Sequence, residues 1–122
     1  MPTSEFSLIY RYFAALGRGD GVDLSVGDDC AILQVRPGER LVTSVDTAVE
    51  GVHFPADSFP EDIAFRAVSA AASDLAAMGA SPLGMTLALT LPAVDDLWLQ
   101  AFSQGHVLTI TRIQPREVRR RA

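Results

Sequence analysis

The sequence predicts a domain that mixes α-helices with β-strands, and three observations support this fold class. Residues 60–78 have the apolar spacing of an amphipathic helix, whereas residues 30–35, 41–49 and 84–91 read as short strands separated by turns and loops. The sequence contains neither a P-loop nor the glycine pattern of a Rossmann fold. The fold is therefore α/β or α+β, of a kind that lacks both of these nucleotide-binding signatures.

Helices are expected at three places. Residues 4–16 repeat apolar side chains at three- and four-residue spacing. The helix over 60–78 opens with a proline and two acidic residues, which suit the positive end of a helix, and Gly79 suits its stop. A last helix is expected to begin at Asp95 and to reach Gly105.

The 122-residue chain has the composition of one folded domain, with 48% hydrophobic and 20% charged residues. Its charge is uneven. Residues 1–105 hold five arginines against fourteen acidic residues, a net charge of −9, whereas residues 106–122 hold five arginines against one glutamate, a net charge of +4. We therefore expect a domain over 1–105 and an atypical arginine-rich tail over 106–122. A solvated basic tail and the product of a changed reading frame are both open explanations for the tail.

The acidic body argues against a nucleic-acid-binding surface, because such surfaces carry clustered lysine and arginine. No apolar run approaches the roughly 20 residues that a membrane-spanning helix needs. The first residues lack the basic and apolar stretches of a signal peptide, and the single cysteine, Cys30, has no partner for an internal disulfide. These features predict a cytoplasmic protein that binds neither nucleic acid nor membrane.

Two acidic motifs accompany the expected strands. Asp29 follows Asp28 directly before the first strand, and adjacent carboxylates repel each other unless a cation or hydrogen-bond donors share the charge. An ordinary turn explains most such pairs. In the second motif, Ser44 and Asp46 lie on one face of an extended backbone and Val45 on the other. A carboxylate beside hydroxyls suits Mg²⁺, although the exposed face of an edge strand has the same pattern.

Two further polar residues stand out. His53 lies in a polar loop, where a surface position is the ordinary outcome and a hydrogen bond to a phosphate is the functional alternative. Asp74 lies near the C-terminal end of the helix over 60–78, where the helix dipole disfavours a negative charge by up to about 1 kcal/mol. A metal ion or a contact with a neighbouring loop would compensate. Together, the acids and hydroxyls indicate a Mg²⁺–phosphate site without a glycine-rich loop.

Four segments, taken in order, resemble the thiamine-monophosphate kinase family. They are Gly-Asp-Asp-Cys-Ala at 27–31, Ser-Val-Asp-Thr at 44–47 with Glu-Gly-Val-His-Phe at 50–54, Ser-Asp-Leu-Ala-Ala-Met-Gly-Ala at 73–80, and Leu-Ala-Leu-Thr-Leu-Pro at 87–92 followed by Trp98 and Leu99. The resemblance runs from Glu5 to about Gly105. The family belongs to the superfamily of aminoimidazole ribonucleotide synthetase and selenophosphate synthetase.

The resemblance implies an ATP-dependent phosphotransferase that converts thiamine monophosphate into thiamine diphosphate with Mg²⁺. By this analogy His53 contacts the substrate, and the metal ligands are Asp29, Ser44, Val45, Asp46 and Asp74. Such a transfer relies on positioning and charge stabilisation, so no catalytic side chain such as a general base is expected. The implied fold is α+β, a β-sheet covered by helices on one side, and the sheet is completed across a homodimer.

The sequence departs from the family pattern in two respects. Position 45 is valine where the family has threonine, so a metal ligand there would be the backbone carbonyl. The family chain also carries a further Gly-Gly-Asp-Thr motif for metal and ATP, and a second domain downstream, and this sequence contains neither. Two alternatives therefore accompany the kinase: a catalytically incompetent chain that folds and dimerises, and another ATP-using enzyme of the same superfamily.

Overall fold

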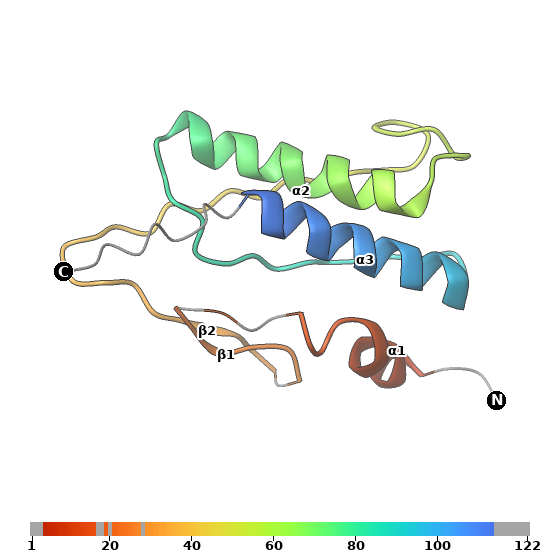
Figure 1. Cartoon of the computed structure of the whole chain (residues 1–122), viewed down its shortest axis with the longest axis horizontal. Helices are drawn as coiled ribbons and strands as arrows, with labels where there is room; N and C mark the ends of the chain where they lie inside the picture. The colour runs from red at the N-terminus through yellow and green to blue at the C-terminus, as the bar shows by residue number, and fades with distance from the viewer. Residues whose placement is uncertain (1–3, 17–18, 20, 28, 114–122) are drawn as a thin grey trace.

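The computed structural model describes residues 4–16, 19, 21–27 and 29–113. In this part the elements are α1 (Glu5–Tyr12), β1 (Val22–Leu24), β2 (Ile32–Leu33), α2 (Pro60–Ala77) and α3 (Asp96–Ile113). Helices α2 and α3 lie side by side, and α3 separates α2 from the layer that contains α1 and the two strands (Figure 1). The described residues therefore form an α+β structure with a small sheet.

The core lies between the two long helices. Its buried hydrophobic residues are Ile63, Ala64 and Val68 of α2 with Leu99 and Phe102 of α3. The ring of Phe102 stacks on Trp98 with centroids 5.0 Å apart and meets the edge of Phe13 at 6.4 Å. Because Phe13 caps the C-terminal end of α1, this aromatic group joins all three helices.

Helix α2 confirms the sequence prediction at both ends. Pro60 lies in the first turn, where its missing N–H is no loss, and Glu61 and Asp62 follow it near the positive end of the dipole. The helix ends at Ala77, and Gly79 then adopts a positive φ of 68°, which glycine tolerates best.

Helix α1 is shorter than the predicted span of 4–16. Ser4 caps it by accepting a hydrogen bond from the Ser7 amide, but the helix ends at Tyr12. The apolar spacing does not bury a full stripe, because the side chains of Phe6 and Tyr10 are each 81% exposed. The prediction of a helix is confirmed, and the longer span is wrong.

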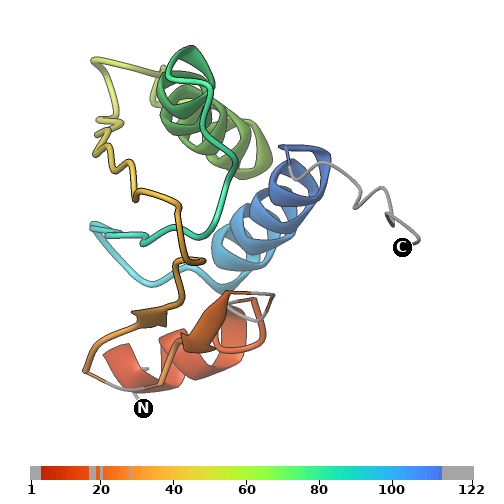
Figure 2. The same ribbon diagram turned by 90° about the vertical axis from the view of Figure 1, so that its left-hand side faces the viewer.

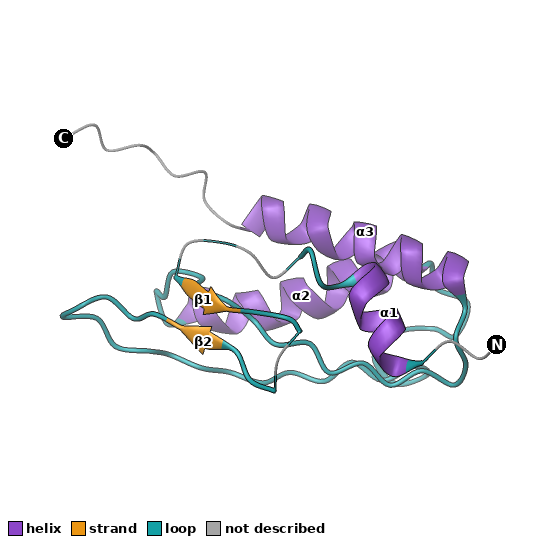
Figure 3. Ribbon diagram, turned by 90° about the horizontal axis from the view of Figure 1, so that it is seen from below, coloured by secondary structure: helices purple, strands orange, loops and turns teal. Residues whose placement is uncertain are grey.

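Strands β1 and β2 pair antiparallel in a two-stranded sheet. Strand β2 confirms part of the prediction over 30–35, whereas β1 lies outside the predicted strands. The predicted strands over 41–49 and 84–91 are wrong, since neither segment joins a sheet of the described residues. Both run as long connections on the same side of α2 and α3 (Figures 2 and 3).

The physical reason is that alternation favours an extended backbone, but a strand also needs a neighbour that accepts and donates its hydrogen bonds. Residues 41–49 are all exposed, and most of 84–91 are exposed as well. The predicted sheet with helices on one side is thus reduced to β1 and β2, and its completion across a dimer stays a prediction.

Helix α3 continues through the position where the composition of the sequence changes. It runs past Gly105 to Ile113, and His106, the first residue of the predicted tail, has a side chain that is only 5% exposed. The prediction of a helix that reaches Gly105 is confirmed, and the division into 1–105 and 106–122 stays a prediction. Residues 114–122 lie outside the described part. None of the described helices is both long and apolar enough to cross a bilayer.

Candidate active site

The segment that carries the second acidic motif runs along α2. The Oγ atom of Ser44 donates a hydrogen bond to Oδ2 of Asp74 at 3.5 Å, which is the outer limit for such a bond. Asp46 lies opposite Ala67 and Ala70, nearer the start of the helix. The segment therefore runs antiparallel to α2 and brings residues 30 positions apart in the sequence into contact.

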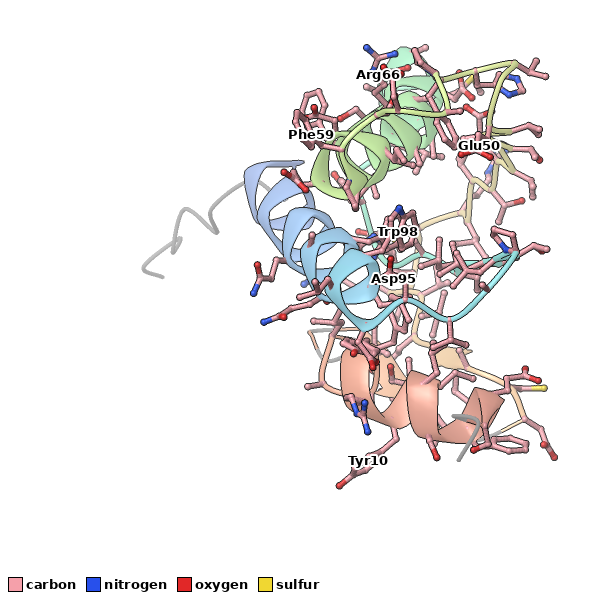
Figure 4. All side chains as sticks on the ribbon, turned by 90° about the vertical axis from the view of Figure 1, so that its right-hand side faces the viewer. Tyr10, Glu50, Phe59, Arg66, Asp95 and Trp98 are labelled. Atoms are coloured by element: carbon pink, nitrogen blue, oxygen red, sulfur yellow. The ribbon has the colours of Figure 1, made fainter. Side chains whose placement is uncertain are left out.

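A cavity of about 260 Å³ lies between this segment and α2. The alanines of the helix leave the space open because they have no side chain beyond Cβ. Figure 4 shows Arg66 on α2 and Glu50 on the chain segment beside it. The residues that line the cavity are Asp46, Thr47, Ala48, His53 and Phe54 from the segment with Arg66, Ala67 and Ala70 from the helix.

The alternation predicted for 44–47 is seen in the structure, although the segment is not a strand. Ser44 contacts α2 and Asp46 lines the cavity beside α2, whereas the side chain of Val45 is 94% exposed. Oδ1 of Asp46 accepts a hydrogen bond from the Thr47 amide at 2.9 Å, which fixes the carboxylate. Val45 can therefore offer a metal ion only its backbone carbonyl.

A tight loop holds His53 in place. The Val49 amide donates a hydrogen bond to Nδ1 of His53 at 2.9 Å, so the neutral imidazole carries its proton on Nε2. Gly51 makes the loop possible, because its φ of 78° lies in the left-handed region, and its amide donates to the Phe54 carbonyl at 2.8 Å. The loop thus presents a ring nitrogen at the cavity that can donate a hydrogen bond to an anion.

Asp74 has the loop contact that its position in the helix suggested. It lies near the C-terminal end of α2, where the helix dipole disfavours its charge. The hydroxyl of Ser44 supplies a hydrogen bond that offsets part of this cost. Ser44, Asp46 and Asp74 together form a set of hard oxygen donors, the kind that Mg²⁺ prefers, and one or two carboxylates suffice for this ion. The donor chemistry of these residues fits Mg²⁺.

Asp29 is not among the residues that line the cavity. It lies, exposed, in the connection between β1 and β2. Within the described ranges, no three histidine, cysteine, aspartate or glutamate side chains are grouped closely enough to hold a metal ion. The five metal ligands therefore stay predictions, with Ser44 and Asp74 in contact and Asp46 two residues from Ser44.

Arg66 is a cavity residue that the sequence reasoning missed. The available signal was its spacing, since Arg66, Ala70 and Asp74 recur every four residues and so share one face of α2. Because Asp46 and His53 face the same cavity, the site combines a guanidinium, an imidazole and a carboxylate. Such a set can bind a phosphate group together with a cation.

A protein-family model described as AIR synthase related protein, N-terminal domain, matches residues 27–114, which is most of the chain and includes every predicted site residue. The chain belongs to this family. The matched residues of the chain include both the segment with Asp46 and helix α2.

Thiamine-monophosphate kinases are among the relatives of this AIR synthase related domain. The kinase of Escherichia coli K12 is 51% identical over 107 residues, which are 86% of this chain and 33% of that protein. The kinase of Haemophilus influenzae is 48% identical over 111 residues, 90% of this chain and 34% of that protein. The kinase of Synechococcus elongatus is 54% identical over 81 residues, 65% of this chain and 25% of that protein. These findings confirm the resemblance, and the chain spans about a third of the length of the first two relatives.

Proposed function

We propose that this chain forms the N-terminal part of an enzyme that transfers the γ-phosphate of ATP to thiamine monophosphate with Mg²⁺, giving thiamine diphosphate. The similar kinases support the reaction. The observation that carries the site is the contact of Ser44 with Asp74, which brings two of the recognised motifs together beside a cavity.

In this proposal Ser44, Asp46 and Asp74 hold Mg²⁺, and Asp29 and the carbonyl of Val45 are further ligands. The bound ion would neutralise negative charge on the phosphate groups during transfer. His53 donates from Nε2 to the phosphate of thiamine monophosphate, because Nδ1 already accepts the Val49 amide. No general base is needed, since the attacking phosphate oxygen is already anionic.

ATP binding and dimerisation are further parts of the proposal. The ATP-contacting residues would lie mainly in the part of the kinases that this chain does not align with. The extended segments 41–49 and 84–91 offer backbone groups for pairing with a second copy, which favours a homodimer. Light scattering coupled to size-exclusion chromatography tests this, and a purely monomeric protein would contradict it. We also propose a cytoplasmic location.

A second candidate is a domain that folds and dimerises but turns nothing over by itself. The part of the chain that aligns with the kinases covers about a third of their length. A different ATP-using enzyme of the superfamily would be revealed by product analysis with other phosphate acceptors.

The experiment that tests the proposed function is the formation of thiamine diphosphate from ATP, Mg²⁺ and thiamine monophosphate. Asp46→Asn removes a predicted ligand, and Asp57→Asn is the matched control on an exposed loop outside the cavity. We expect turnover that is lost in Asp46→Asn and kept in Asp57→Asn. Turnover that survives Asp46→Asn would contradict the assigned site, and a folded protein without turnover would favour the second candidate.

A further inference from the structure

Arg66 is a cavity arginine without an ion pair in the described part of the chain. Arg11, by contrast, pairs with Asp96 at 3.3 Å. Arg66 also has an acidic neighbour on its own helix, Asp62, at the four-residue spacing that favours pairing. Among the described residues the ion pair is formed by Arg11 and Asp96, and Arg66 does not pair with Asp62. The guanidinium of Arg66 is therefore available to bind a ligand at the cavity.

The surroundings of Arg66 match an anion with several oxygens. A guanidinium carries five N–H donors in a planar fork that fits phosphate. His53 lines the same cavity and has Nε2 free to donate, because its Nδ1 accepts the Val49 amide. Asp46 is the one carboxylate among the cavity-lining residues. A phosphate group that brings Mg²⁺ with it would satisfy the two donors and the carboxylate at once.

We infer that Arg66 binds a terminal phosphate group in this cavity, together with His53. The inference rests on the proposed function and extends it by naming a residue that positions the phosphate. Two sources share this chemistry, the phosphate monoester of thiamine monophosphate and the γ-phosphate of ATP. Because Arg66 holds the group without taking part in bond making, its loss should weaken phosphate binding and leave the recognition of the thiazole and pyrimidine rings unchanged.

Calorimetric titration in the presence of Mg²⁺ tests this inference with four probes: thiamine monophosphate, thiamine, ATP and inorganic phosphate. The variants are Arg66→Gln and Arg66→Lys, with Arg36→Gln as the control, since Arg36 is exposed in the turn after β2 and does not line the cavity. A urea unfolding curve for each variant shows that the fold is kept.

We expect Arg66→Gln to weaken, by about tenfold or more, the binding of whichever probe places its phosphate group in the cavity. Arg66→Lys should restore part of this binding, and Arg36→Gln should bind the probes like the wild type. Thiamine, which has no phosphate, should bind equally to all variants. A loss confined to thiamine monophosphate identifies the monoester as the group bound, and a loss confined to ATP identifies the γ-phosphate.

The two proposals fail in different ways. If Arg66→Gln binds all four probes like the wild type, or if the wild type binds none of the phosphate probes, the role of Arg66 is overturned. If inorganic phosphate binding depends on Arg66 but thiamine monophosphate binds no better than inorganic phosphate, the role of Arg66 stands and the proposed substrate is contradicted.

Discussion

Gly105 on α3 lies directly against Glu61 on α2, so closely that a Cβ at Gly105 would be 2.7 Å from the Cα of Glu61. Real Cβ atoms do not approach backbone atoms to this distance. The absence of a side chain at Gly105 therefore lets the N-terminal end of α2 pack against α3 beyond the buried Phe102.

Gly105→Ala should lower the free energy of unfolding, by about 1–3 kcal/mol, because the added methyl group forces the two helices apart. Helix propensity acts in the opposite direction, since alanine is favoured over glycine by about 1 kcal/mol within a helix. Urea unfolding measures the net effect. Gln104→Ala, at the exposed neighbouring position, is the control. An unchanged or increased stability of Gly105→Ala would show that the helices do not pack this closely.

Tyr12 connects α1 to the start of α3. Its hydroxyl donates a hydrogen bond to Oδ1 of Asp96 at 2.6 Å, and this bond raises the pKa of Tyr12 above its ordinary value of 10.0. Since the pKa is raised in the folded state, the stability from this contact is present below about pH 10 and is lost as the pH rises through the folded pKa.

Absorbance titration tests this pKa. Tyr10→Phe leaves Tyr12 as the remaining tyrosine of the two in the chain. In that background Tyr12 should ionise above pH 10, and Asp96→Asn should move its pKa back toward 10. Identical titration curves with and without Asp96 would contradict the contact.

His106 should make the fold sensitive to acid. It is buried, its Nδ1 has no partner among the described residues, and its burial lowers its pKa below the ordinary value of 6.5. The unfolded chain takes up a proton near pH 6.5, whereas the folded chain resists it, so stability is kept above this pH and is lost as the pH falls below it. Unfolding free energies measured at pH 7.5 and 5.5 should differ more for wild type than for His106→Phe. The same difference in His106→Phe as in the wild type would exclude His106 as its source.

Gly51 should matter for binding as well as for stability. Its φ is 78°, and a Cβ added there would meet nothing within 4 Å, so Gly51→Ala suffers backbone strain of about 1–2 kcal/mol without a clash. Gly38→Ala is a matched control, because Gly38 has a φ of 82° and equally open surroundings, in a turn outside the cavity.

Both substitutions should lower the unfolding free energy by similar amounts. Gly51→Ala alone should weaken binding of thiamine monophosphate. The loop that contains Gly51 holds His53 in place, so strain in this loop would displace the proposed substrate contact. Equal affinities in the two variants would show that the loop does not position a substrate contact.

The parts of the fold that follow from local sequence could be predicted. The proline, acids and glycine around α2 act within a few residues of each other, so its ends were found to within one residue. The pattern also predicted correctly that Ser44 and Asp46 lie on one face of their segment and Val45 on the other, because this alternation is a property of the extended backbone itself.

The parts of the fold that depend on partners distant in the sequence could not be predicted. Whether 41–49 pairs as a strand depends on a neighbour that the local sequence does not specify, and this segment lacks one in the described structure. Arg66 enters the site only because the chain after Asp46 folds back along α2. No end for α3 could be predicted from the sequence, because the charge pattern changes after Gly105 while the helix continues to Ile113.

The proposal that Asp46, His53 and Asp74 form one Mg²⁺-dependent site for thiamine monophosphate is tested most directly by backbone amide NMR shifts during titration with this compound, with and without Mg²⁺. We predict Mg²⁺-dependent shifts along 44–54 and around Arg66 and Asp74, and none around the exposed turn at Gly38. Shifts that are the same without Mg²⁺, or that fall outside these two segments, would contradict the proposed site.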